Sequence, residues 1–514
     1  MGKYMFLANF PSYSSNVTTS DTYNKYYYKG SFRLIIGKDS TVLSESQINS
    51  ILEEANNSYD TYIKSFDYNK PVNENIFIDI YIANTNAYNG YFNKYETIGS
   101  NYAGYATYYY DNAPYFVLNY VKKSSFEQSL NILKVTIAHE LFHTIQYSYG
   151  IDSVSDNMWC KDVWWLEATA TMMEEMIYPE INDYTNFLPY IYNYSTLNFE
   201  TFNYPQIGCY GDISGHEYGM SIYALFLVKK FGLNIIKDTF TKFDKNIDFY
   251  TAIKNLIEEM GYDFDSILKE FYYSLYNPKE FYSDYKLFPN IKISDKTSIQ
   301  KSGFIYTDIN LSDLNYTNDN LASNIELFMP IEEVNKTDKK YLIYAKSDIS
   351  DLNKELARYF MQIKTVNGWQ LFSNSFSQNF DLTIFDNAII IWVYRDNKYI
   401  GTSSFQSIKD ELKESGLLME QDILYPFEGA WIYSQSSNNI NIPSYNLSEY
   451  NTTFNNSFEI KNMFLNNNTE QNISIFGYQY NRWRVFNSDY KSYYNKLNYL
   501  MFHDGYFVRG NKSK

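Results

Sequence analysis

The chain has 514 residues, a length that accommodates two or three domains with separate hydrophobic cores. Hydrophobic residues make up 45% of the sequence, which excludes an intrinsically disordered chain. The formal net charge of −16 argues against a nucleic-acid-binding protein, because such proteins need a basic face to neutralise phosphates. No apolar run approaches the roughly 18 residues that a membrane-spanning helix needs, so we expect no membrane span.

The first part of the chain predicts strands and helices in alternation. Ser44, followed three residues later by Gln47, is typical of a capping box at the start of a helix. Every second residue from Ile76 to Ile82 is isoleucine, which predicts a strand with one buried face. Residues 102–120 predict a further hairpin or edge strand.

The middle of the chain, from about residue 129, has a helical pattern. Apolar residues recur there at steps of three and four, and glycine or proline follows several of these stretches. The predicted helices cover approximately residues 132–145, 163–177, 217–231, 249–260 and 265–276.

The pattern changes again beyond residue 290, to short β-rich runs separated by Asn, Ser and Asp turns. Their spacing suits an antiparallel sandwich, with one short helix around Ile408–Glu414. The predicted strands include Tyr341–Tyr344, Trp369–Phe372, Ile389–Tyr394, Trp431–Tyr433 and Ile473–Phe476.

Two of the four histidines, His139 and His143, fall in the segment TIAHELFHTIQY. Residues four apart on a helix lie one above the other on the same face, so both imidazoles can reach one zinc ion. Glu140 follows the first histidine and can lie beside the open coordination position, where it takes a proton from water. This spacing predicts a zinc-dependent hydrolase with Glu140 as its general base; a helix with two incidental histidines is the alternative.

A catalytic zinc ion usually has three protein ligands. Gln146 and Tyr149 stand where a metzincin needs Gly and His, so that class is excluded. Glu167, in the segment DVWWLEATATMMEEM, lies far enough beyond His143 for a loop and a return into a second helix. We therefore predict Glu167 as the third zinc ligand.

The histidine motif followed by W-x-E-A-x-A resembles the gluzincins, in which the third zinc ligand is a glutamate. The segments VTIAHELFHTIQY, WWLEATATMMEE and HEYGMSIYALFLVKKFG together resemble the MXAN_6640-type family of secreted bacterial metallopeptidases, over roughly residues 75–232. The resemblance implies a zinc peptidase in which His139, His143 and Glu167 bind Zn²⁺ and Glu140 is the base.

The fold class expected from the patterns and the resemblance is α+β. A zincin (thermolysin-like) catalytic domain with a mixed sheet and active-site helices would be followed by a mostly β C-terminal sandwich. The predicted parts are residues 1–128, the α/β part of the zincin domain; 129–288, its helical part with the zinc site; and 289–514, the β-rich domain. The resemblance implies a secreted or cell-surface protein, although the first residues show no signal peptide.

The groups around the metal are less firmly indicated. Thermolysin-like enzymes have Asp four residues beyond the Glu ligand, where this chain has Thr171. Glu174 can instead accept a hydrogen bond from a ligand histidine, although with Glu175 it also fits a solvated helix face. A gluzincin needs a donor for the oxyanion of the tetrahedral intermediate, and His216 and Tyr218 are the candidates. A helix-start histidine and a core tyrosine are the alternative interpretation.

These residues favour an endopeptidase that acts on a protein or peptide substrate. Two other functions stay open: a zincin that acts on glycoproteins and binds glycan through its Tyr- and Trp-rich C-terminal domain, and an adhesion protein that keeps an inactive zincin body. Intact ligands and an intact Glu140 count against the adhesion protein. Cys160 and Cys209 either form one disulfide or remain two thiols.

Overall fold

The computed structural model describes residues 13–71, 77–99, 103–109, 113–151, 156–201, 215–243, 247–309, 323–330, 340–360, 362–365, 367–374, 379–396, 398–425, 428–441, 473–479, 482–487, 499–501 and 506–510. Contacts divide the chain into two compact units. The first consists of Met1–Tyr194, Phe199–Tyr262 and Phe281–Pro289, and the second of Ser195–Asn198, Asp263–Glu280 and Asn290–Lys514. The second unit thus includes two short segments that precede residue 289 in the chain.

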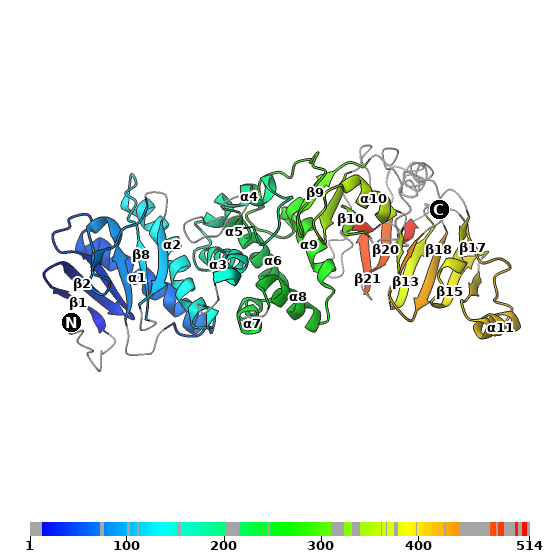
Figure 1. Ribbon diagram of the computed structural model, residues 1–514, viewed down its shortest axis with the longest axis horizontal. Coiled ribbons are helices and arrows are strands. Elements are labelled where there is room, and N and C mark those ends of the chain that lie inside the picture. The colour runs from blue at the N-terminus through cyan, green and yellow to red at the C-terminus, as the bar shows by residue number, and fades with distance from the viewer. Residues whose placement is uncertain are drawn as a thin grey trace. The chain divides into compact units, whose positions relative to one another are not determined.

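The described strands of the first unit are β1 (Tyr13–Ser20), β2 (Asn24–Gly30), β3 (Phe32–Gly37), β4 (Ile78–Ile82), β5 (Tyr88–Asn89), β6 (Lys94–Tyr95), β7 (Gly104–Tyr108) and β8 (Pro114–Leu118). Six of them form a mixed sheet in the order β1-β2-β3-β4-β8-β7. Strands β1, β2 and β8 of this sheet are labelled in Figure 1. β4 pairs in parallel with β3 and β8, and the other neighbours are antiparallel. The β7–β8 hairpin confirms the hairpin predicted for residues 102–120. Among the described strands, β7 lies at the edge of the sheet.

Two long helices, α1 (Glu45–Asp60) and α2 (Phe126–Tyr147), pack against this sheet and against each other. The Ser44 hydroxyl accepts a hydrogen bond from the Gln47 N–H, and the Gln47 side chain accepts one from the Ser44 N–H. The predicted capping box is therefore confirmed. α2 contacts β7 and β8, so the helix with the predicted histidine ligands lies along the edge of the sheet.

β4 is buried along its whole length, so the prediction of one buried face was wrong. The Asp79 carboxylate pairs with Arg33 and accepts a hydrogen bond from the Tyr109 hydroxyl at 2.8 Å. Tyr81 packs edge-on against Tyr115 in an aromatic cluster. The reason is that β4 is a central strand covered on both faces. Its alternating polar and aromatic residues therefore find partners inside the protein and do not face water.

The further described helices of the first unit are α3 (Asp156–Ile177), α4 (Leu188–Asn193), α5 (His216–Gly219), α6 (Ser221–Phe231), α7 (Asn234–Lys242) and α8 (Phe249–Glu259), with helical turns η1 (Thr61–Ser65), η2 (Ala83–Thr85), η4 (Asp183–Asn186) and η7 (Tyr285–Leu287). α2, α3 and α8 confirm predicted helices, but residues 217–231 form two helices where one was predicted. Near this break, a Cβ added to Gly219 would lie only 3.0 Å from the Phe187 carbonyl oxygen. Glycine therefore allows α5 to approach the start of α4 this closely.

The second unit contains, in its described part, α9 (Phe264–Tyr276), η6 (Pro278–Glu280), β9 (Phe304–Thr307), β10 (Ile325–Pro330), β11 (Tyr341–Ala345), α10 (Leu352–Phe360), β12 (Gln362–Lys364), β13 (Gly368–Ser373), β14 (Phe380–Asp381), η10 (Leu382–Ile384), β15 (Ala388–Arg395), β16 (Lys398–Thr402), α11 (Gln406–Glu414), β17 (Ile423–Leu424), β18 (Gly429–Ser434), β19 (Asn439–Asn441), β20 (Ile473–Gln479), β21 (Arg482–Asn487), β22 (Tyr499–Met501) and β23 (Tyr506–Gly510). These strands pair antiparallel.

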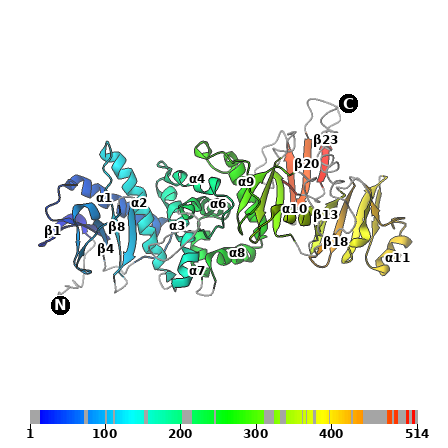
Figure 2. The same ribbon diagram turned by 45° about the horizontal axis from the view of Figure 1, so that its top comes forward.

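Two four-stranded sheets, β22-β10-β11-β9 and β13-β18-β15-β16, dominate the described part of this unit. The neighbouring strands β13 and β18 of the second sheet are labelled in Figure 2. Strands of both sheets contribute to one hydrophobic core, to which Ile343 belongs from the first sheet and Ile391 and Ile432 from the second. The predicted β-rich runs and the short helix at α11 are confirmed. The α+β class, with a mixed sheet followed by antiparallel sheets, is therefore confirmed as well.

Among the described residues, no single helix has the length and apolar character that crossing a membrane requires. His216–Phe231 and Asn234–Lys242 reach these criteria only as a pair that is bent by 111°. Cys209 and the side chain of Cys160 lie outside the described residues, so both alternatives for the cysteines stay open.

The start of α2 generates a stability prediction. The Ser125 hydroxyl accepts a hydrogen bond from the Gln128 N–H at 3.2 Å and so caps the helix. We expect Ser125→Ala to lower the free energy of unfolding by about 1 kcal/mol in urea titrations. The matched control is Ser124→Ala, because the Ser124 hydroxyl donates a hydrogen bond to the exposed Gln128 side chain and, among the described residues, caps no helix N–H. Equal effects of the two substitutions would contradict the capping role.

Candidate metal centre

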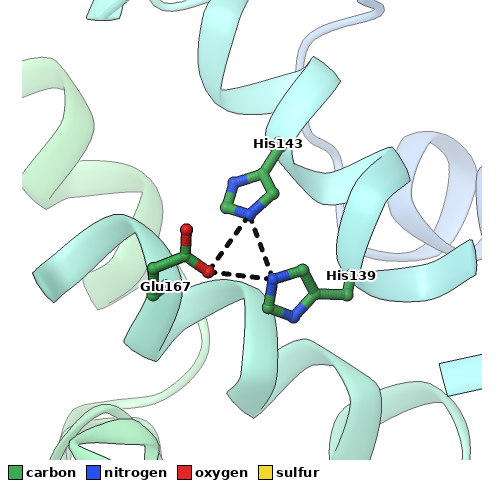
Figure 3. Close-up of side chains that lie close together, drawn as sticks. All are labelled: His139, His143 and Glu167. Atoms are coloured by element: carbon green, nitrogen blue, oxygen red, sulfur yellow. Dashed lines mark hydrogen bonds and ion pairs between the residues drawn. The ribbon is translucent and has the colours of Figure 1, made fainter. Parts of the chain in front are cut away.

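Two neighbouring helices bring the three predicted ligands together (Figure 3). On α2, the Nε2 atoms of His139 and His143 lie 3.0 Å apart. On α3, the Glu167 Oε2 lies 3.0 Å from the Nε2 of His139 and 3.4 Å from that of His143. The three side chains point toward one another. Among the described residues, they form a group that could hold a metal ion.

The spacing of these three atoms fits one small cation. Zinc binds imidazole nitrogen and carboxylate oxygen at roughly 2.0–2.2 Å, which in a tetrahedral arrangement separates the ligand atoms by roughly 3.3 Å. The observed separations are 3.0, 3.0 and 3.4 Å. Three protein ligands at these distances leave one tetrahedral position for water or substrate, which is the pattern of a catalytic zinc site.

The hydrogen bonds around His143 fix where its proton lies. The buried amide of Gln146 donates from Nε2 to the Leu166 carbonyl and to the Thr169 hydroxyl, both at 3.0 Å. The amide Oε1 therefore faces the Nδ1 of His143, 2.8 Å away, and must accept its proton. Because Nδ1 carries the hydrogen, the Nε2 of His143 presents a lone pair toward the other ligands.

A carboxylate likewise faces the outer ring nitrogen of His139 and accepts its proton in a hydrogen bond. The Glu174 Oε1 lies 2.7 Å from the Nδ1 of His139, and Glu174 is buried beside it. Asp183, in η4, lies within hydrogen-bonding distance of the Glu174 carboxyl group. Glu174 is thus a buried partner of a predicted ligand histidine, and the alternative that it lies on a solvated helix face is wrong.

Three lone pairs therefore converge at the centre of the site, and they require a positive charge between them. Burial by itself would lower the pKa of His139, but hydrogen bonds to Glu167 and Glu174 raise it well above its ordinary value. Burial would raise the pKa of Glu167, yet the two histidines hold it well below its usual range. The site thus favours positive charge, which a proton or a metal ion can supply in competition.

Glu140 lies next to the ligands, between α2 and the edge strand β7. Burial raises the pKa of its carboxyl group, which also accepts a backbone hydrogen bond from Ala106 of β7. A Cβ added to Gly104 would lie 2.7 Å from the Glu140 Oε1, so glycine is what allows the strand to approach so closely. The arrangement keeps a buried carboxylate at the edge of the metal centre.

α5 brings one of the two predicted oxyanion donors to the site. The Tyr218 ring centroid lies 6.0 Å from that of His139 and 5.1 Å from that of Phe187. His216 is buried and is not part of the described ligand group, and its Nδ1 has no hydrogen-bond partner among the described residues. The geometry therefore brings Tyr218 to the ligands, whereas no contact with them is described for His216.

Sequence reasoning missed two residues that shape this site, Gln146 and Glu217. Gln146 was used only to exclude metzincins, although it stands one helical turn beyond His143, where a side chain can reach the imidazole. Glu217 is fully buried, and burial raises its pKa to about 7, with the charge of Glu167 adding to the effect. Its carboxylate accepts hydrogen bonds from the Gly215 N–H at the start of α5. Both residues lie in segments that carry the family resemblance, but the sequence gives no signal for the hydrogen bonds that they make.

The chain was compared with known protein families and with curated proteins. No family model matches it, and no curated protein matches it either.

Glu174 and Glu175 offer a matched pair of variants. Glu174→Ala removes the acceptor that holds the His139 ring, so we expect metal affinity to fall by about 10- to 100-fold in a chelator competition assay. Glu175→Ala is the control, because the charges that act on the Glu175 carboxyl group are those of Asp284, Lys229, Glu180 and Glu174 and not those of the histidines. If both variants bound metal as tightly as the wild type, the positioning role of Glu174 would be refuted.

Because His216 is buried, we expect the free energy of unfolding to depend on pH. Burial lowers its pKa to about 4, compared with about 6.5 in an unfolded chain. Between these values the unfolded state binds more protons, so this contribution to stability is complete above pH 6.5 and is lost as the pH falls toward 4. Between pH 7 and pH 4, the unfolding free energy of the wild type should fall as His216 becomes protonated in the unfolded state. We expect the unfolding free energy of His216→Leu to fall by about 3 kcal/mol less over the same range. Urea titrations at both pH values measure the difference; parallel losses would contradict it.

Proposed function

We propose that this chain is a zinc-dependent peptidase that hydrolyses peptide bonds. One observation carries the proposal: two imidazole nitrogens and one carboxylate oxygen converge at 3.0–3.4 Å, with a second, non-ligating carboxylate, that of Glu140, beside them. Two neutral histidines and one glutamate are a donor set typical of catalytic zinc in peptidases. A purely structural zinc site would instead use four protein ligands and leave no position for substrate.

A zinc ion held by His139, His143 and Glu167 would supply Lewis acidity, polarising the scissile carbonyl and lowering the pKa of water toward 7. Glu140 then takes the proton of the attacking water and delivers it to the leaving amine. Burial raises the pKa of Glu140, which suits both roles, because the group must accept a proton and afterwards release it. The Ala106 N–H holds this carboxylate in place during the transfer.

Tyr218 is the proposed donor to the oxyanion of the tetrahedral intermediate. Its ring lies against the ligand His139 and against Phe187, which restrict the orientation of the phenol. A phenol O–H that is fixed in this way can donate a hydrogen bond to an oxygen on which negative charge develops. His216 lacks a described contact with the ligand group, so it is not assigned this role.

The edge strand β7 is the proposed platform for the substrate backbone. β8 pairs with one of its sides, and the strand contacts α2 close to the metal ligands. An extended peptide can add to such an edge through backbone hydrogen bonds. The Tyr147 hydroxyl donates to the Ala106 carbonyl at 3.3 Å, a bond that an incoming amide N–H would replace. The substrate class that this arrangement suits is an extended protein or peptide segment.

The decisive test is Glu140→Gln in the full chain. Because Glu140 is not a ligand, we expect the variant to retain stoichiometric zinc in elemental analysis. Without the proton carrier, cleavage of a mixed peptide library should fall by about 100- to 10,000-fold. Wild-type cleavage should stop on addition of a chelator and return with zinc.

The matched control is Gln128→Glu, which changes charge and amide chemistry on the same helix far from the ligands. It should cleave like the wild type. Absence of zinc from the wild type, or equal cleavage by wild type and Glu140→Gln, would overturn the proposal.

A further inference from the structure

One face of the β13-β18-β15-β16 sheet in the second unit carries an unusual set of side chains. Residues directly opposite each other in an antiparallel sheet share a face. Trp369 pairs with Tyr433, and Trp431 pairs with Trp392 on the next strand. Trp392 pairs in turn with Gly401, and Tyr394 with Tyr399. We call this set the aromatic face; its rings are Trp369, Trp392, Tyr394, Tyr399, Trp431 and Tyr433.

The opposite face of the same sheet packs on the hydrophobic core, which makes the aromatic residues on this face unusual. Phe372, Ile391 and Ile432 alternate with the aromatic face and are buried in the hydrophobic core of the unit. None of the six rings belongs to this described core, although Leu371, opposite Trp431 on the same face, is buried. A sheet with one face on the core normally presents polar residues on the other. Here the described residues of the aromatic face include no charged side chain.

The rings form a supported platform. Trp369 lies 5.0 Å from Tyr433 and 6.3 Å from Trp431 between ring centroids, and Tyr394 lies 5.1 Å from Tyr399. Trp392 lies over Gly401, where an added Cβ would approach its ring carbons to 2.9 Å. Glycine at this position lets the indole lie close to the sheet. The rings thus continue across all four strands, each steadied by a neighbour.

The exposed area of this face is small for a protein partner. Trp369, Tyr394 and Tyr399 are 39%, 56% and 51% exposed, and the other three rings are half-buried. The six rings together expose roughly 250–650 Å², because a whole aromatic side chain contributes roughly 150–250 Å². A stable protein interface takes about 800 Å² from each partner. A second copy of the chain or another folded protein is therefore a poor match.

The chemistry of the face favours a neutral sugar chain. Pyranose rings present C–H groups on a flat apolar side, which pack on the electron-rich faces of Trp and Tyr. The three tyrosine hydroxyls on the face can donate to and accept from sugar hydroxyls at the same time. A nucleic acid also stacks on aromatic rings, but its phosphates require Lys or Arg, which the described residues of this face lack.

We propose that the aromatic face binds a neutral polysaccharide chain, with successive pyranose units stacked on the rings of the four strands. This binding site belongs to the second unit alone. It does not depend on the metal centre of the first unit, so either assignment can fail without the other.

The experiment uses the full chain and a panel of soluble neutral polysaccharides: a mixed-linkage β-glucan, a xylan and a galactomannan. Affinity electrophoresis should show retardation by at least one of them. Trp369→Ala and Trp431→Ala should each weaken that binding by about tenfold, and the double variant should abolish it. Phe405→Ala is the matched control, because Phe405 is a 41% exposed aromatic residue of the same unit that lies outside the aromatic face.

Circular dichroism and the melting temperature of each variant verify that the unit remains folded, since all three substitutions are at partly exposed rings. No retardation by any polysaccharide of the panel would overturn the proposal. Equal loss of binding in Phe405→Ala would do so as well. Concentration-dependent dimerisation that Trp369→Ala removes would identify a second copy of the chain as the occupant and would also refute the sugar assignment.

Discussion

The convergence of three lone pairs between α2 and α3 is the interaction on which the first unit depends. His139, His143 and Glu167 point acceptor atoms at one another across 3.0–3.4 Å, an arrangement that is unfavourable unless a positive charge lies between them. Gln146 and Glu174 occupy the outer nitrogens of the two imidazoles, so the inner nitrogens keep their lone pairs. A cation bound there would stabilise the packing of the two helices at the same time as it gained its ligands.

The surrounding structure is organised to keep this geometry fixed. The Gln146 amide bonds both to His143 and to the helix that carries Glu167, so one buried side chain links the two ligand-bearing helices. On the other side, Tyr62 donates to the Ala138 carbonyl beside the first histidine. Trp165 is fully buried and donates to Thr239 on α7, which anchors α3. Ligands held in this way need little rearrangement when they bind metal, which is the general condition for an efficient site.

The two units differ in how far the polar and aromatic side chains of their sheets are buried. In the first unit, polar groups on β4 are buried and paired, as Asp79 is with Arg33 and Tyr109. In the second unit, Trp369, Trp431 and their neighbours remain partly exposed and lie outside the described core. The ligand proposed for this face would account for these partly exposed rings. The chain thus combines a candidate catalytic unit with a candidate binding unit.

The sequence by itself predicted the three residues that the structure brings together as a group able to hold a metal ion. Helical spacing alone brings His139 and His143 to one face, and Glu167 stands in a second helix rich in bulky apolar residues. The sequence also indicated the α+β class and the strands of the second unit from their residue patterns. Only the tertiary structure showed that Tyr218 lies against His139, that Glu174 is buried beside the same histidine, and that both faces of β4 are buried. The physical reason is that periodicity reports which face of an element is apolar, whereas a hydrogen bond or a buried polar pair depends on what the opposite element places there.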